Sequence, residues 1–165
     1  MVPDASGKNP TGGVRGERHR LRGPSRIDPA PPATAKKRVL FVCIGNSCRS
    51  QMAEAFAQAY GADIMEVQSA GVSPASYIAP LTKQTLGEWN LNIDDHFPKG
   101  MDVMQRQTFD VVVNMSGTPL QFPGARMVDW IVQDPIGQSE DFYRTVATQI
   151  EDLVMRLILE LRAAT

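Results

Sequence analysis

The chain has 165 residues, with 17 Lys and Arg against 18 Asp and Glu and a formal net charge of −1 at pH 7. This length suits one domain, and a charge so close to zero argues against a dedicated binder of nucleic acid or anionic membrane. No apolar run reaches the roughly 18 residues of a membrane-spanning helix. Two cysteines, Cys43 and Cys48, are too few for a disulfide framework and favour a reducing compartment.

The first part of the sequence differs in composition from the rest. Six of the first 35 residues are Pro and five are Gly, and apolar residues stand alone there. Such a segment buries too little apolar surface to offset its conformational entropy. We therefore expect a disordered tail at 1–36 and one catalytic domain at 37–165. The basic run at 15–26 is expected to be solvated, and the lack of a secretory h-region predicts a cytoplasmic protein.

The predicted elements of the domain alternate between strands and helices. Short β-branched and aromatic runs predict strands at 38–43, 63–70, 109–114 and 126–131. Helical periodicity predicts three helices. The first ends at Gly61, the second covers 80–90, and the third begins after an N-cap at Ser139. This alternation predicts an α/β three-layer sandwich, in which a four-stranded parallel sheet has helices on both faces. Ligands of such sheets bind at the carboxyl ends of the strands, where residues 43–50 fall.

The loop after the first strand has the pattern of an anion site. It reads Cys-Ile-Gly-Asn-Ser-Cys-Arg-Ser, and a backbone curled between a strand and a helix directs its N–H groups at a tetrahedral oxyanion. Gly45 permits close backbone approach, and Asn46 tolerates a left-handed conformation. Arg49 can bind two oxygens with its planar fork. The expected anion-binding residues are Ile44, Gly45, Asn46, Ser47, Cys48, Arg49 and Ser50.

Cys43 lies at the base of this loop and is the candidate nucleophile. A thiolate in an electropositive cup can attack a bound phosphorus or arsenic atom. Asp134 is the candidate general acid, because it follows the fourth strand at the same edge of the sheet. An Asp-Pro pair alone marks a turn, but next to an anion loop it predicts a proton donor for the leaving oxygen. Two His and two Cys offer no metal cluster, and no nucleotide motif occurs, so neither a metal nor a cofactor is expected.

These residues resemble the low-molecular-weight protein tyrosine phosphatase superfamily, which includes the thioredoxin-type arsenate reductases. The matching stretches are 39–54, 68–71, 92–96, 109–113 and 134–135. The resemblance implies a phosphocysteine mechanism. Cys43 attacks, Arg49 and the loop amides bind the oxyanion, and Asp134 first protonates the leaving group and then activates water. It also implies a supporting network of Asn46, Ser50, Ser69 and His96.

The residues point to two branches of this superfamily. At Ser47 and Gln51 the sequence resembles the arsenate reductases. Reductases with an internal thiol relay carry two further cysteines, however, and residues 114–123 of this chain contain none. The missing relay favours a phosphatase that hydrolyses phosphomonoesters, with protein phosphotyrosine or a small phosphomonoester as substrate. The alternative is an arsenate reductase that uses an external thiol reductant. A non-catalytic anion-binding module is the third reading, and Cys43, Arg49 and Asp134 argue against it.

Three further expectations concern the surroundings of the loop. The resemblance suggests a reversible Cys43–Cys48 disulfide that protects the nucleophile, and a Cys48 thiol that only packs is an equal alternative. Ile136 stands where the phosphatases usually have an aromatic residue after Asp-Pro, so Tyr77 is considered as a wall instead.

The third expectation concerns a cation. Some reductases hold a potassium ion at positions matching Glu54 and Ser69, where this chain has Lys99 nearby. We expect the Lys99 ammonium to pair with Glu54 in place of a metal.

Overall fold

The computed structural model describes residues 35–164. Residues 1–34 of the predicted tail, with its basic run, lie outside the described residues. Four strands, β1 (Lys37–Cys43), β2 (Met65–Gly71), β3 (Val111–Asn114) and β4 (Arg126–Asp129), form one sheet in the order β2-β1-β3-β4. All pairs are parallel, and β1 pairs with β2 from Lys37↔Met65 to Cys43↔Gly71. The predicted four-stranded parallel sheet is confirmed.

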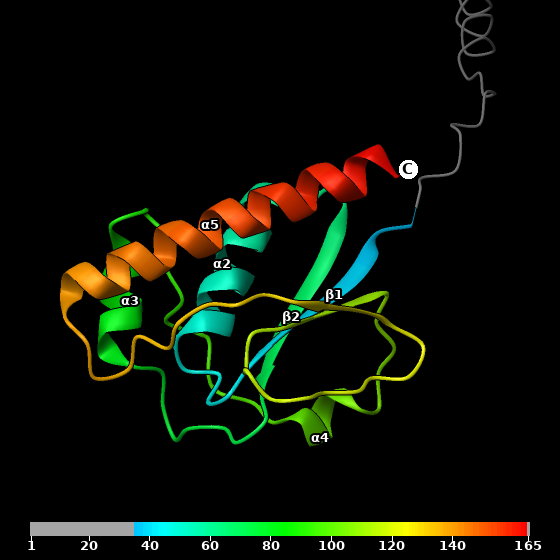
Figure 1. The fold of residues 1–165 in the computed structure, drawn as a ribbon. Helices are drawn as coiled ribbons and strands as arrows, with labels where there is room; N and C mark the ends of the chain where they lie inside the picture. The colour runs from blue at the N-terminus through cyan, green and yellow to red at the C-terminus, as the bar shows by residue number, and fades with distance from the viewer. Residues whose placement is uncertain (1–34, 165) are drawn as a thin grey trace, which may run out of the picture. The chain divides into compact units, whose positions relative to one another are not determined.

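Alternate residues of β1 face two separate apolar layers. Val39 and Phe41 pack with residues of the helices α2 (Arg49–Gly61), α3 (Pro80–Gly87) and α5 (Glu140–Ala163). Figure 1 shows these three helices on one side of the sheet. Leu40 and Val42 pack on the other side, against Met104 of α4 (Met101–Met104) and the loops beyond it. Because β1 is an interior strand with a layer on each face, its central residues are fully buried. The predicted three-layer arrangement is confirmed.

The structure differs from the sequence prediction at several element ends. Strand β2 begins at Met65 rather than at residue 63. Strand β4 ends at Asp129 rather than at 131, because its partner β3 offers only four residues for pairing. Helix α3 ends at Gly87, and a turn continues to Asn90, whose φ is 62°. The four-residue α4 was not predicted, since one turn carries no periodicity. No helix in the described range 35–164 is long and apolar enough to cross a membrane.

Candidate active site

The loop between β1 and α2 directs its carbonyl groups away from its own centre. Asn46 has a φ of 52°, the left-handed conformation expected of it. The carbonyls of the three residues before this turn accept hydrogen bonds from the segment after β2: Val72 N to Cys43 O (3.0 Å), Ser73 N to Ile44 O (2.8 Å) and Ala75 N to Gly45 O (2.9 Å). With the carbonyls held outside, the amides of the loop are turned inward.

The inward amides form a cup, here called the anion cup, over residues 43–49. Within the described chain, the backbone amides of 45–48 donate to no protein group. Helix α2 starts at the rim of the cup, its N-cap Cys48 makes no side-chain cap, and its first turn has no acidic residue. Uncapped amides at a helix N-terminus carry partial positive charge. The cup is therefore suited to a small oxyanion.

A chain of hydrogen bonds leads to the Cys43 sulfur. Glu54 accepts the hydroxyl hydrogen of Ser69, and the Asn46 amide donates to the hydroxyl oxygens of both Ser69 (2.9 Å) and Ser50 (2.7 Å). The Ser50 hydroxyl lies 2.9 Å from Cys43 Sγ. Because Ser50 accepts from Asn46, its own hydrogen is free to point at the sulfur, an arrangement that stabilises a thiolate.

Gln51 ties the left-handed turn to a more distant segment. Its amide nitrogen donates to Asn46 Oδ1 (3.1 Å), and its Oε1 lies 3.0 Å from His96 Nδ1. The Lys99 backbone amide donates to the same Asn46 oxygen (2.9 Å). Among residues 35–164, the ring of the predicted network residue His96 reaches the loop through Gln51. No network role was predicted for Gln51, although a fully buried glutamine in an Ala-rich helix needs polar partners.

Arg49 is anchored by one nitrogen and unpaired at another. Its Nη1 donates to Met115 O (2.6 Å) and Val132 O (2.9 Å), and its Nη2 lies 3.6 Å from Asp134 Oδ2. Its Nε is the one buried side-chain nitrogen or oxygen without a hydrogen-bond partner among residues 35–164. An unpaired buried donor is costly in a folded protein. The Nε/Nη2 edge is thereby left for an anion.

Asp134 lines the same cavity as Cys43, and its side chain is half exposed. Its Oδ1 accepts the amide of Ile136 (3.1 Å), which leaves Oδ2 toward Arg49. A cavity of about 160 Å3 is lined by Cys43, Cys48, Arg49 and Asp134 together with Ile44, Gly45, Ser47, Ala75 and Ile136. The structure thus brings the predicted nucleophile, arginine and acid around one small space. The predicted residues Asn46, Ser50 and Ser69 lie fully buried behind it.

The second cysteine is turned toward α5. Cys48 is 3% exposed, and its Sγ lies 3.5 Å from the hydroxyl of Tyr143. Burial raises the pKa of the Cys48 thiol and also the pKa of Tyr143. Both cysteines are free thiols. The Cys43–Cys48 disulfide stays a prediction.

Packing around the cup depends on Gly71, whereas the close backbone approach expected at Gly45 stays a prediction. A Cβ at Gly45 would meet its nearest neighbour, the Ala75 side chain, at 3.6 Å, an ordinary contact. A Cβ at Gly71 would instead lie 2.6 Å from Ile44 O and 2.8 Å from Asn46 N. Packing within the protein therefore requires glycine where β2 ends against the cup, and not at residue 45. The Ser-Ala-Gly sequence at the end of the predicted second strand was the available signal.

The expected pairing of Lys99 with Glu54 is wrong as a direct contact. The Lys99 ammonium donates to Phe97 O (3.1 Å), whereas Glu54 accepts from Ser69 and from Gln58. Burial lowers the pKa of Lys99, and the charge of Glu54 opposes this. Glu54 thus acts on Lys99 only at longer range. Residues 35–164 contain no group of three or more His, Cys, Asp or Glu side chains placed to hold a metal.

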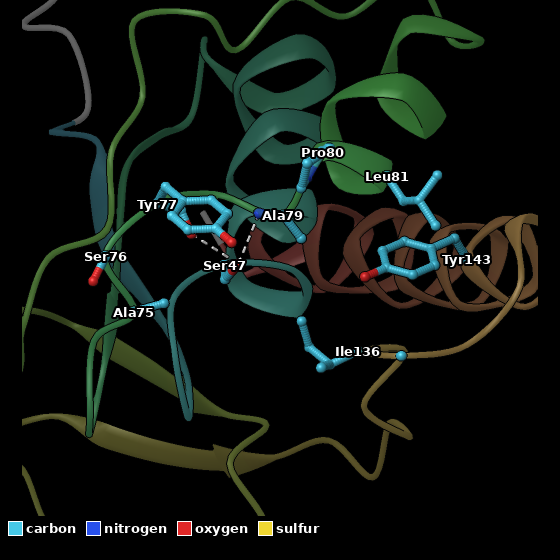
Figure 2. Close-up of a pocket in the computed structure, with 10 residues that line it drawn as sticks. Ser47, Ala75, Ser76, Tyr77, Ala79, Pro80, Leu81, Ile136 and Tyr143 are labelled. Carbon is cyan, nitrogen blue, oxygen red and sulfur yellow. Dashed lines mark hydrogen bonds between the residues drawn. The ribbon is translucent and has the colours of Figure 1, made fainter.

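A second cavity of about 460 Å3, here called the side cavity, adjoins the cup. It shares three lining residues with the cup: Ser47, Ala75 and Ile136. Tyr77, considered as a wall from the sequence, and Tyr143 also line it (Figure 2). The Ser47 hydroxyl accepts the Ala79 amide (2.8 Å) and donates to Tyr77 O (3.2 Å), which fixes the border between the two spaces.

Comparison with known proteins agrees with this geometry. Residues 38–165 match the family described as low molecular weight phosphotyrosine protein phosphatase. The chain is 34% identical over 130 residues to a glutaredoxin arsenate reductase of Synechocystis, covering 76% of this chain and 98% of that protein. It is 32% identical over 126 residues to an arsenate reductase of Bacillus cereus, covering 73% and 93%.

Solved structures include both kinds of enzyme. An arsenate reductase in its phosphate-binding state has a TM-score of 0.70 and 33% identity, covering 76% of this chain and 98% of its own. An arginine phosphatase of Geobacillus stearothermophilus has a TM-score of 0.69 and 27% identity, covering 78% and 94%. The fold, the loop and these matches agree, and the chain belongs to the low molecular weight phosphotyrosine protein phosphatase family, an enzyme class with cysteine-dependent catalysis.

Proposed function

We propose that this protein is an arsenate reductase that draws its electrons from an external thiol. The observation that carries the proposal is the Gln51 amide, which fixes Asn46 and joins it to His96. Gln51 is one of the two positions at which the sequence resembles the reductases rather than the phosphatases. Relatives named arsenate reductase, at 32–34% identity, support the same choice. The sequence alone ranked phosphomonoester hydrolysis first, and these relatives favour the opposite order.

In the proposed reaction, arsenate binds in the cup against the inward amides and the Nε/Nη2 edge of Arg49. The Cys43 thiolate attacks arsenic, an S–As bond forms, and one arsenate oxygen leaves as water. Ser50 stabilises the thiolate before attack, and Asp134, which lines the same cavity, supplies a proton to the departing oxygen. The product of this step is an arseno-cysteine adduct in which arsenic is still pentavalent.

Reduction then needs two electrons. An external thiolate forms an S–S bond with Cys43 while the S–As bond breaks, and the electron pair of that bond stays on arsenic, which leaves as arsenite. A second thiol reduces the mixed disulfide and restores Cys43. We assign these thiols to a partner because 114–123 contains no cysteine. The one other thiol, Cys48, is buried beside Tyr143 with a raised pKa.

One preparation decides between the two chemistries. Arsenite formation is measured with glutaredoxin plus glutathione, with thioredoxin and with small thiols, and hydrolysis of an aryl phosphate is measured in parallel. We expect arsenite to form only when a thiol is supplied, with one disulfide formed per arsenite. Cys43→Ser should form neither arsenite nor disulfide. Efficient phosphate-ester hydrolysis without any arsenite formation would refute the proposal.

Phosphomonoester hydrolysis is the second candidate, and the position of Asp134 favours it. A carboxyl group with one oxygen directed over the cup can protonate an ester oxygen and afterwards activate water. If hydrolysis is the reaction, Asp134→Ala should slow esters with poor leaving groups by about 10²–10⁴-fold and activated aryl esters much less. Asp134→Asn, which keeps the amide contact to Ile136, is the matched control for loop geometry.

A further inference from the structure

The side cavity provides a place next to the cup for the body of a second reactant. The two spaces share Ser47, Ala75 and Ile136, so a molecule seated in one can extend into the other. The cup itself, at about 160 Å3, has room for little more than an oxyanion, whereas the side cavity, at about 460 Å3, has the size of an organic ligand site.

The lining of the side cavity is uncharged. Within the described chain it consists of apolar side chains, glycine and the hydroxyls of Ser47, Ser76, Tyr77 and Tyr143, with no acidic or basic residue. Figure 2 shows Tyr77 and Ile136 on either side of Ser47, while Leu81 of α3 and Tyr143 of α5 form the far end. A carboxylate or ammonium placed against this lining would lose part of its water without gaining a charged partner. The cavity therefore favours an uncharged molecule with hydrogen-bonding groups.

Another cavity behind the cup does not offer the same route. It measures about 560 Å3 and is lined by Arg49, Asp129, Trp130 and Ile131 among others, but not by Cys43. Two of these side chains are charged. Its border with the cup is the Arg49 side chain, which is anchored to Met115 O and Val132 O. A sulfur atom that must reach Cys43 is therefore better delivered from the side cavity.

We propose that the side cavity binds the body of the external thiol and selects an uncharged thiol over a charged one. This inference rests on the proposed reductase function. The thiol sulfur enters the cup past Ser47 and bonds to Cys43 Sγ as the S–As bond breaks, with the electron pair remaining on arsenic. Charged thiols such as glutathione are then poor direct reductants, and a small neutral thiol is preferred.

The experiment compares two thiols that differ in one charge, N-acetylcysteine and its amide. Rates are measured for arsenite formation and, separately, for release of thiopyridone from a mixed disulfide preformed at Cys43. Each rate is divided by the rate of the same thiol with a small disulfide in solution, which removes intrinsic reactivity. We expect the full-length protein to prefer the amide by about tenfold or more, because the carboxylate finds no partner in the side cavity.

Variants place a positive charge in one cavity or the other. Two variants, Leu81→Lys and Ser76→Lys, place an ammonium in the side cavity, where it can attract the carboxylate of the charged thiol. Each should reduce the preference for the amide about fivefold or more. Leu81→Met keeps size without charge and should stay within about twofold of the parent. Ile131→Lys, at a side chain 93% exposed on the other cavity, should also stay within about twofold.

The two readouts separate the inference from the function on which it rests. The inference is overturned if the corrected preference is near one, if Ile131→Lys shifts it as much as Leu81→Lys, or if neither side-cavity lysine shifts it. If no arsenite forms but thiopyridone release keeps the expected pattern, the reductase function fails and the thiol subsite stands. If arsenite forms but neither readout shows a preference for the neutral thiol, the reductase function stands and the thiol subsite fails.

Discussion

The two walls of the candidate site are built differently. On the cup side, the turn at Asn46 is fixed by side chains or backbone of Ser50, Gln51, Ser69 and Lys99, all within hydrogen-bond distance. On the opposite side, Asp134 makes one hydrogen bond to its own loop and lies 3.6 Å from Arg49. The cup is buried and connected to three parts of the fold, whereas the Asp134 wall is half exposed and nearly self-contained.

This difference separates anion binding from the choice of reaction. A preorganised cup recognises any small tetrahedral oxyanion, because backbone amides read shape and charge rather than the central atom. The loop around Asp134 and Ile136 borders both the cup and the side cavity, where the second reactant differs between hydrolysis and reduction. Substitutions in the cup should therefore affect every reaction of the enzyme, and substitutions at Ile136, which borders the side cavity, should affect reactions selectively.

The largest effect is expected at Cys43. Cys43→Ser should abolish both arsenate reduction and ester hydrolysis, because a hydroxyl cannot replace the thiolate. It should retain phosphate binding, since the cup consists of backbone amides and Arg49. Isothermal titration with phosphate measures the second part. Retained turnover, or loss of saturable phosphate binding in a folded variant, would contradict the separation of nucleophile and cup.

Arg49→Lys should be nearly as severe and should weaken anion binding as well. A lysine ammonium cannot hold Met115 O and Val132 O while also presenting two donors to an anion. We expect a loss of about 10²–10³-fold in kcat/KM for either substrate. Both substrates are assayed on the same preparation, and a loss confined to one of them would show that the guanidinium serves one chemistry rather than the cup.

Gly71→Ala tests the packing of the cup against β2. Its Cβ would meet backbone atoms of the loop at 2.6–2.8 Å, and backbone cannot move as a flexible side chain can. We expect a destabilisation of about 1–3 kcal/mol, measured by urea unfolding, together with weaker phosphate binding. Gly87→Ala is the matched control, because no atom lies within 4 Å of its Cβ and the exchange in α3 should be neutral or slightly stabilising. Equal effects in the two variants would mean that the contact at Gly71 does not shape the cup.

The smallest effect concerns Cys48 and its pH dependence. In Cys43→Ser, iodoacetamide can label only Cys48, and the thiolate is the reactive form. Since burial raises the pKa of Cys48, the folded variant should be labelled more slowly at neutral pH than the same variant unfolded in urea. The difference in rate should shrink as the pH rises above the usual thiol range. Mass spectrometry gives the rates. Equally fast labelling of the folded variant at neutral pH would make Cys48 a reactive thiol and favour an internal disulfide over an external reductant.

The sequence by itself determined the architecture and the anion loop. Strands with continuous apolar runs and helices with a clear period fix an α/β sheet, and the carboxyl edge of that sheet then locates Cys43, Arg49 and Asp134 together. The left-handed turn at Asn46 was also predictable, because few residues other than Asn and Gly tolerate it. These features depend on local chemistry and on topology, both of which can be inferred from one chain.

The tertiary structure alone decided which groups complete the site. Gln51 contacts His96 and Tyr143 contacts Cys48 across 45 and 95 residues of sequence, and Gly71 pairs with Cys43 from another strand. No local pattern encodes such separations. The same is true of Lys99, whose backbone rather than its ammonium supports the loop. Close approaches and shared hydrogen-bond acceptors arise only when separate elements pack, so their partners are set by the three-dimensional arrangement and not by neighbours in the sequence.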